Sequence, residues 1–198
     1  MIIENIIKDP DRILELTDIA SKDSHRNAKN YKDFKRRLKN YIAFHVILDE
    51  GEVVGFGGVY QNDEWPKDLV RINDRMWHHP THRFKGLDQV GGKEIGLSSE
   101  ILIPHQTEFC QVRRWQPFIS VEGLSRRKAL EKILINHIDP KYGYKLLPDM
   151  YFTCTNKNGQ LLDKQCWQSV IAMIDDIDLP KMSTQLIAGM EINFLKGT

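Results

Sequence analysis

Three histidines gather in one short stretch, MWHHPTHRFKGL, residues 76–87. The imidazoles of His78, His79 and His82 could bind a metal, act as general bases or pack against other side chains. Neighbouring residues of a strand point to opposite faces, so His78 and His79 do not readily share one ion. The stretch also has no nearby cysteine and no H-E-x-x-H helix, so we expect no metal here. An imidazole facing a cleft could instead remove the proton of an ammonium substrate, directly or through water.

Arg83, Lys85 and Gly86 in the same stretch suggest a second chemistry, which is phosphate binding. A pyrophosphate needs several converging backbone N–H groups, and a glycine turn that leads into a helix provides them. The alternative is a basic turn on the surface. Residues 87–96 contain three further glycines, and they are either an insertion or the true phosphate loop.

Two further sets of polar residues lie on segments that we expect to be strands, one at a strand end and one along a strand. Glu122 lies at a strand end, where active groups often lie in open α/β sheets, and could act as a base or bind substrate. Otherwise it stabilises the N-terminus of the following helix. Arg71, Asn73 and Arg75 alternate and should therefore share one face of a strand. They could line the pocket of an acidic substrate, although a solvated face paired with Asp or Glu is the plainer interpretation.

The composition is that of an ordinary globular protein. The chain has 198 residues, 41% of them hydrophobic and 28% charged, with a formal net charge of +1. A net charge this close to zero argues against a general positive electrostatic field that would attract nucleic acids. No apolar run approaches the roughly 18 residues of a membrane helix, and the N-terminus does not resemble a secretion signal. The cysteines form no C-x-x-C pair, so reduced thiols in a cytoplasmic protein are expected; they are Cys110, Cys154 and Cys166.

The first half of the chain predicts two helices and three strands. These are helices over 10–20 and about 30–40, hairpin strands over 41–48 and 52–60, and a third strand over 69–79. Asp49-Glu50-Gly51 supplies the turn of the hairpin. Gly55, Gly57 and Gly58 indicate a bulge or a close approach of another backbone in the second strand.

The second half predicts alternating helices and strands. They are a helix within 97–113, a strand over 116–123, a helix over 124–138, a strand over about 151–155 and a last helix over 163–177. Pro104 means that the first of these helices either begins near Ile103 or kinks. The tail, 180–198, carries no clear pattern. The order predicts an α/β (α+β mixed) fold with a mixed, mostly antiparallel sheet and helices on both faces.

Taken together, these segments resemble the acyl-CoA-binding core of the GNAT superfamily of N-acetyltransferases. That family shows a strand that ends near a proline and then an R/Q-x-x-G-x-G/A loop that leads into a helix. Here residues 76–82 lie at the strand end, and Arg83-Phe84-Lys85-Gly86 matches R-x-x-G. The resemblance covers about residues 41–155. Other segments that fit its order are the hairpin at 53–58, the strand at 118–122 and the helix at 126–130.

The resemblance implies one acyl-CoA N-acyltransferase-like domain over 1–198, with N-terminal helices at 10–40, a core at 41–155 and a C-terminal helix and tail at 163–198. It implies direct transfer of an acetyl or other acyl group from acyl-CoA to the amine of a small molecule or peptide, within a ternary complex and without a metal. A homodimer is compatible with it.

The resemblance also implies roles for individual residues. The backbone of Met76, Trp77 and His78 would pair with the pantetheine amides. The pyrophosphate would lie against Arg83, Phe84, Lys85 and Gly86. The candidates for the base that takes the amine proton are His78, His79 and Glu122.

Two alternatives remain open at this point. The position at which the family often places a tyrosine general acid is Ile133, and the loop after Gly86 departs from the family pattern. Both departures favour a non-catalytic acyl-CoA-binding or assembly module. A nucleic-acid-directed acyltransferase that uses the basic segment 29–39 is the second alternative, and the low net charge argues against it.

Overall fold

The computed structural model describes most of the N-terminal half of the chain and separate segments of the rest. The described residues are 1–23, 31–61, 63, 67–82, 97–122, 134, 138–146, 150–155, 167–173, 184–187 and 190–196. The chain divides into two compact units, Met1–Asn62 with Arg71–Phe109 and Asp63–Val70 with Cys110–Thr198. Within the described residues, no helix is long and apolar enough to cross a membrane. A single domain over 1–198 stays a prediction.

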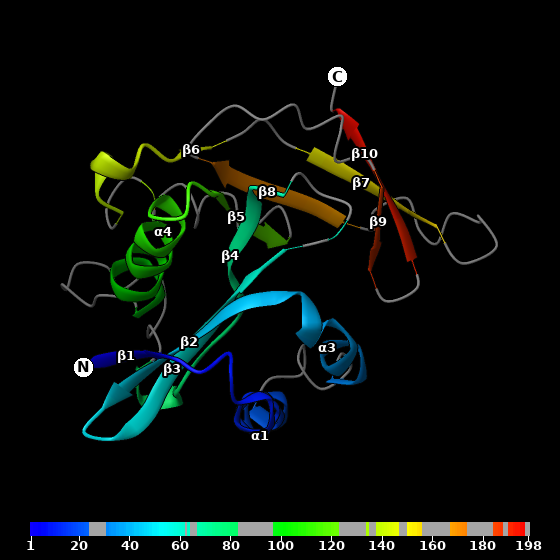
Figure 1. Cartoon of the computed structure of the whole chain (residues 1–198). Coiled ribbons are helices and arrows are strands. Elements are labelled where there is room, and N and C mark those ends of the chain that lie inside the picture. The colour runs from blue at the N-terminus through cyan, green and yellow to red at the C-terminus, as the bar shows by residue number, and fades with distance from the viewer. Residues whose placement is uncertain are drawn as a thin grey trace. The chain divides into compact units, whose positions relative to one another are not determined.

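The sheet of the first unit is antiparallel throughout and follows the order of the chain (Figure 1). Its strands are β1 (Ile2–Asn5), β2 (Tyr41–Asp49), β3 (Glu52–Tyr60) and, from Arg71 onward, β4 (Leu69–His78). Glu50 and Gly51 take positive φ angles of 50° and 87°, which suit a tight hairpin turn. The predicted hairpin and third strand are therefore confirmed. The edge strand β1 was not predicted.

The helices of this unit confirm the predicted positions. They are α1 (Pro10–Asp23), α3 (Tyr31–Arg37) with the 3-10 turn η1 (Leu38–Asn40), and α4 (Ile103–Gln111) after the π-helical turn η4 (Leu97–Leu102). Pro104 is the second residue of α4, a position in the first turn at which proline is tolerated. Of the two alternatives for this segment, an α-helix that begins at Ile103 is therefore correct.

Helices cover both faces of this sheet. Phe44 and His45 are neighbours on β2, so their side chains point to opposite faces. The ring of Phe44 lies 6.3 Å from that of Phe34 in α3. The ring of His45 lies 4.7 Å from that of His105 and 5.1 Å from that of Phe109, both in α4. Figure 1 shows α1 and α3 together on one side of β2 and α4 on the other. The predicted mixed α/β class is confirmed.

A row of aromatic rings forms the core beneath α3. Phe34 contacts Tyr41 at 5.4 Å between ring centroids, Tyr41 contacts Phe44 at 5.9 Å, and Phe44 contacts Phe56 at 5.4 Å. Trp77 of β4 stacks on Phe56, with centroids 5.4 Å apart and planes inclined by 24°. Such ring contacts stabilise beyond the area they bury. They fix β2, β3 and β4 against one helical layer.

The second unit contains a second run of antiparallel strands. In spatial order they are β5, β8, β7, β10 and β9, with β6 also paired to β8. Their bounds are β5 Gln116–Glu122, β6 Lys145–Leu146, β7 Met150–Thr155, β8 Trp167–Met173, β9 Thr184–Ile187 and β10 Met190–Lys196.

Two sequence predictions for this unit are confirmed and one is wrong. The strands predicted over 116–123 and about 151–155 are β5 and β7. The last predicted helix, over 163–177, contains the strand β8, whose residues pair with β5 in the register Phe118↔Met173. A short apolar run fits a buried strand as well as a helix, and this one pairs on both edges. The helix predicted over 124–138 falls almost entirely outside the described residues.

Candidate functional site

Strand β4 is interrupted twice where it pairs with β3. The paired residues are Phe56↔Trp77, Gly58↔Asp74 and Tyr60↔Arg71. In each interval β4 therefore places two residues opposite one residue of β3, which is the definition of a β-bulge. Asn73 and Arg75, one in each interval, have positive φ angles of 56° and 53°. The bulge that the glycines of β3 indicated is present, and the extra residues belong to β4.

The bulges change which side chains of β4 share a face. Arg71 Nη2 lies 2.6 Å from Asp74 Oδ1, three residues along the strand. Asn73 instead lies on the α4 side, where its Oδ1 and Leu102 are the nearest groups to a Cβ built at Gly57. The prediction that Arg71, Asn73 and Arg75 alternate on one face is therefore wrong for Arg71 and Asn73, because the strand does not keep a period of two.

A glutamine of α4 bridges the two strands across the bulged region, bonding Gly57 from one interval and Asn73 from the other. The Gln106 side chain is fully buried. Its Nε2 donates to the carbonyl oxygen of Gly57 at 2.8 Å, and its Oε1 accepts from the backbone N–H of Asn73 at 2.7 Å. The same Nε2 lies 3.4 Å from Nδ1 of His45. The carboxamide thus supplies one hydrogen bond to each strand where the ladder is disrupted. Sequence analysis did not single out this residue.

On the opposite face the bulges create a buried ionic group, which we call the Asp74 cluster. It consists of Arg37, Tyr41, Tyr60, Arg71 and Asp74. The Tyr41 hydroxyl donates to Asp74 Oδ2, Arg71 forms the ion pair described above, and Arg37 Nη2 lies 3.9 Å from Asp74 Oδ2. The Arg37 guanidinium carbon stands 4.3 Å from the centre of the Tyr60 ring, and that of Arg71 stands 5.2 Å from it.

Electrostatics keep the Asp74 carboxylate charged despite its burial. Burial alone would raise the pKa of Asp74, but the positive charges of Arg71, Arg37 and Arg75 and the Tyr41 hydrogen bond outweigh it and lower that pKa. Burial, together with the Asp74 charge, raises the pKa of Tyr41 well above its ordinary value. Burial also opposes the charge of Arg37, but Asp74 and the two tyrosines more than compensate and raise its pKa. The cluster therefore holds a carboxylate, two guanidinium ions and the neutral phenol of Tyr41, beside the ring of Tyr60.

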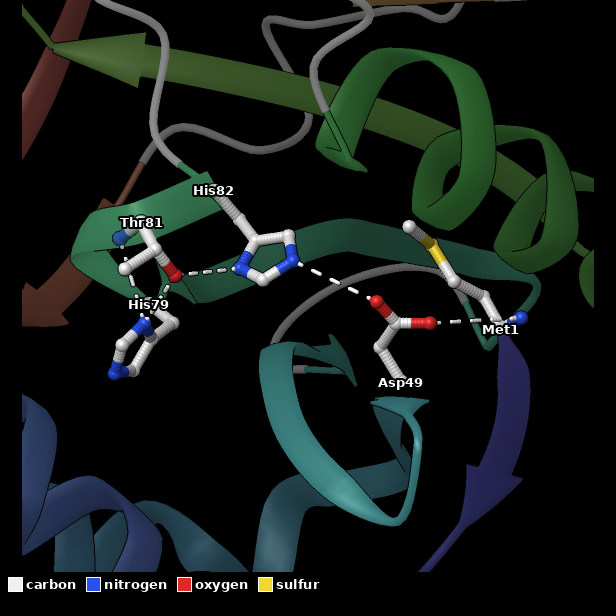
Figure 2. A network of polar contacts seen from close by, with 5 residues as sticks. All are labelled: Met1, Asp49, His79, Thr81 and His82. Atoms are coloured by element: carbon white, nitrogen blue, oxygen red, sulfur yellow. Dashed lines mark hydrogen bonds and ion pairs between the residues drawn. The ribbon is translucent and has the colours of Figure 1, made fainter.

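A second polar network lies just beyond the end of β4, in the 3-10 turn η2 (Pro80–His82). Figure 2 shows the Thr81 hydroxyl between two imidazoles. Its Oγ1 lies 2.7 Å from Nδ1 of His79 and 2.9 Å from Nδ1 of His82. His82 Nε2 lies 3.7 Å from Asp49 Oδ2, and the other oxygen of Asp49 lies 3.9 Å from the amino group of Met1. The network thus joins the strand end to the β2–β3 turn and to the start of β1.

His78 has a different environment from His79. A Cβ built at Gly55 would lie 3.1 Å from His78 Cδ2, so the ring packs over a glycine of β3. Burial, with a smaller contribution from His82, lowers the pKa of His78 to about 4. Trp77 lies in the aromatic core, whereas Met76 is 42% exposed. The three predicted cofactor-pairing residues thus have one buried, one half-buried and one exposed side chain.

The remaining predicted site residues lie elsewhere or outside the described residues. Glu122 is the last residue of β5 and is paired in register with Ser169 of β8. Ile133 and residues 87–96 are not described, and neither are Arg83, Phe84, Lys85 and Gly86. Among the residues that the structure does describe, no group of three or more His, Cys, Asp or Glu is placed to hold a metal ion.

Comparison with known proteins identifies the fold. No protein-family model and no curated protein matches the sequence. The solved structures with a similar fold include an acetyltransferase of the GNAT family from Streptococcus pneumoniae, which is 11% identical with a TM-score of 0.50 over 88% of this chain and 99% of that one. Another, the smu.2055 protein from Streptococcus mutans UA159, is 14% identical with a TM-score of 0.52 over 88% of this chain and 99% of that one.

A third example agrees with these two. A protein from Bacteroides thetaiotaomicron whose structure is assigned to the GNAT family is 14% identical, with a TM-score of 0.50 over 90% of this chain and 89% of that one. At identities this low, likeness of structure establishes the fold alone. The resemblance seen in the sequence is thus confirmed at that level: the chain has the fold of the GNAT acetyltransferases.

Proposed function

We propose that the protein is an N-acyltransferase that moves an acetyl or other acyl group from an acyl-CoA to an amine of a small molecule or peptide. The observation that carries this proposal is the position of the strand end within the fold. β4 ends at His78, and the turn Pro80–His82 leads directly to Arg83-Phe84-Lys85-Gly86. The R-x-x-G sequence thus follows the strand after which the family places its pyrophosphate loop.

The proposed cofactor site uses backbone groups at the end of β4. The backbone of Met76, Trp77 and His78 pairs with the pantetheine amides like an added strand. The segment that follows, Arg83, Phe84, Lys85 and Gly86, holds the pyrophosphate through its N–H groups and two cations. Packing of the Trp77 ring on Phe56 supports this role, because it fixes the end of the strand in position.

Among the candidate bases, His79 has the most suitable environment. A base whose conjugate acid has a pKa of about 4 takes up a proton from an ammonium ion poorly, so we assign His78 a backbone role. Glu122 at the end of β5 is the alternative base. His79 is exposed, and its Nδ1 contacts the Thr81 hydroxyl.

The tautomer of His79 decides whether its Nε2 can act as the base. The backbone N–H of Thr81 donates to Nδ1 at 3.3 Å, so a neutral ring held this way carries its proton on Nε2. His79 therefore accepts the amine proton at Nε2 only in the other tautomer, whose Nδ1–H donates to Thr81 Oγ1, and the proton then stays on His79. The neutral amine attacks the thioester carbonyl, the C–S bond breaks, and CoA leaves as a thiolate that takes up the second proton lost by the amine nitrogen. Holding the two reactants in line supplies much of the rate.

Calorimetric titration with acetyl-CoA and with free CoA tests this proposal. We expect micromolar binding by the wild type and weaker binding by the double variant Arg83→Ala, Gly86→Asp. Lys8→Ala, which removes an exposed cation elsewhere, should bind as the wild type does. Release of the CoA thiol in the presence of amines then measures transfer. No binding by the wild type would refute the proposal, and binding without transfer to any amine would favour the non-catalytic module.

A further inference from the structure

Within the described residues, the Asp74 cluster carries more positive charge than it neutralises. Arg37 and Arg71 together bring two positive charges, and Asp74 is the only carboxylate that the described residues place in an ion pair with either of them. The side chains are only 13%, 14% and 10% exposed for Arg37, Arg71 and Asp74. Removing an uncompensated charge from water is costly, so a buried surplus cation calls for an anionic partner.

The cluster also has hydrogen-bond donors to spare. Asp74 Oδ1 is bonded to Arg71, and Oδ2 accepts the Tyr41 hydroxyl. Arg37 Nη2, at 3.9 Å from that same Oδ2, is too far for a hydrogen bond. A guanidinium has five N–H donors, and Arg37 uses one of them for a hydrogen bond with Tyr60. Moreover, Nε of Arg71 is buried without a hydrogen-bond partner in the described part of the chain.

We propose that the Asp74 cluster binds the carboxylate of the amine that receives the acyl group, with Arg37 and Arg71 as its donors beside the Tyr60 ring. This inference rests on the proposed function and narrows its acceptor to amines that also carry a carboxylate, such as amino acids. A carboxylate offsets the positive charge that Asp74 leaves uncompensated on Arg37 and Arg71, and its two oxygens fit the planar fork of a guanidinium.

The position of the cluster on β4 agrees with such a role. Asp74 precedes Met76–His78, the proposed pantetheine-pairing segment, by two to four residues on the same strand. At roughly 3.3 Å per residue a regular strand would span about 7–13 Å here, and the bulge at Arg75 makes the actual span shorter. An amino acid whose carboxylate lies at the cluster can therefore extend its amine toward the acyl group, whereas the CoA pyrophosphate belongs to the loop beyond the other end of that segment.

The first arm of the test uses acetate ion as the probe and needs no catalysis. We expect sodium acetate to raise the Tm of the wild type above its value in sodium chloride of the same ionic strength, because a ligand of the folded state stabilises it. Arg37→Gln should abolish this rise, since Arg37 makes no hydrogen bond to Asp74 and its loss leaves the Arg71 and Tyr41 contacts in place. Lys35→Gln, an exposed charge on the same helix, should keep it.

The second arm compares amines that differ only in the carboxylate. The pairs are phenylalanine with phenylethylamine, arginine with agmatine, and lysine with cadaverine. We expect kcat/KM to favour the carboxylated member, and Arg37→Gln to lower it by about tenfold for that member alone, the effect of one charged hydrogen bond. A merely structural role of Arg37 would lower kcat/KM for both members equally. Affinity for acetyl-CoA should be unchanged, and a fall would place a cofactor phosphate at the cluster and overturn the inference.

The two arms separate the inference from the proposed function. Acyl transfer without any preference for the carboxylate, together with no effect of acetate on Tm, would overturn the inference and leave the function standing. An Arg37-dependent effect of acetate in a protein that does not bind acetyl-CoA would support the carboxylate site and refute the acyltransferase. If no amine of the panel reacts, the acetate arm decides alone, and the absence of an Arg37-dependent rise overturns the inference.

Discussion

Gln106 and Asn73 come from different elements of the first unit and meet at a break in the sheet. Oε1 of Gln106 accepts the backbone N–H of Asn73 at 2.7 Å, while Nε2 of the same carboxamide donates to Gly57 O at 2.8 Å. A side-chain amide thus takes the place of a backbone amide between β3 and β4. A bulge leaves backbone N–H and C=O groups without partners in the ladder. Here Gln106 of α4 bonds two such groups, the Asn73 N–H and the Gly57 C=O, and this makes the bulge tolerable.

Replacing this amide should be costly. Gln106→Leu keeps much of the volume but leaves a buried N–H and a buried C=O unpaired, at about 1–3 kcal/mol for each group. We expect the free energy of unfolding, measured by urea denaturation, to fall by roughly 2–5 kcal/mol. Gln111→Leu makes the same change at an exposed position at the end of the same helix and should change it by less than about 0.5 kcal/mol. Equal effects of the two variants would show that the bridge contributes nothing.

The regular strands could be predicted from the sequence, whereas their irregularities depend on contacts that are distant in the chain. Alternation and the Asp49-Glu50-Gly51 turn are local signals, and they located the hairpin. The glycines of the second hairpin strand indicated a bulge, and Asn73-Asp74 inside an otherwise β-rich run is a further local sign of it, because Asn and Asp favour turns and Asn tolerates positive φ. Gln106 gave little signal, since a single polar residue within an apolar helical face does not reveal what it bonds.

Gly58 is required by the close approach of the Tyr41 ring. A Cβ on Gly58 would overlap Cδ1 and Cε1 of that ring. The ring is held by its neighbours Phe34 and Tyr60, at 5.4 and 5.3 Å between centroids, so it cannot move away freely. We expect Gly58→Ala to lower the free energy of unfolding by about 1–3 kcal/mol or more, the usual cost of overpacking.

Gly55→Ala is the matched control for this prediction. Its new Cβ would meet its nearest atom, His78 Cδ2, at 3.1 Å, which a small shift of the ring can accommodate. It should therefore cost clearly less than Gly58→Ala in the same urea titration. If both alanines cost the same, the Tyr41 contact does not determine the residue at position 58.

The second unit shows where sequence patterns mislead. Trp167–Met173 contains adjacent apolar residues that satisfy a helical period as easily as a strand buried on both faces. What decides its structure is pairing with Phe118–Glu122 and with Met150–Phe152, and neither segment is adjacent in the sequence. β1 was missed for the same reason, because its four residues gain their strand conformation by pairing with residues 45–48.

The charge of Asp74 should make stability depend on pH in the acid range. Its pKa is lowered in the folded state, so the unfolded chain binds the proton more tightly. The resulting stabilisation is fully present above the ordinary pKa of an aspartate, near 4, and is lost as the pH falls through the lower folded value. We expect the free energy of unfolding of Asp74→Asn to fall less steeply than that of the wild type as the pH is lowered through this range, which we call the acid limb. At neutral pH it should lower the free energy of unfolding by roughly 3–5 kcal/mol, because two arginines lose their partner.

Asp11→Asn, at an exposed position in the first turn of α1, serves as the control. Urea denaturation from pH 2 to pH 7 should give it the same acid limb as the wild type. An unchanged acid limb in Asp74→Asn would mean that the arginines do not stabilise the charged carboxylate.

His78 should make the free energy of unfolding depend on pH in a second range, above that of Asp74. Its folded pKa is about 4, compared with 6.5 for the ordinary side chain, because burial disfavours the charged ring. The unfolded chain therefore binds more protons between these values, and the free energy of unfolding rises with pH from about 4 to 6.5, by on the order of 3 kcal/mol. NMR titration of the ring protons should place the midpoint of His78 near 4, and His78→Gln should remove the dependence in this window. His79→Gln, at the exposed neighbouring position, should retain it. A His78 midpoint near 6.5 would show that the ring is solvated, and would restore His78 as a candidate base beside His79.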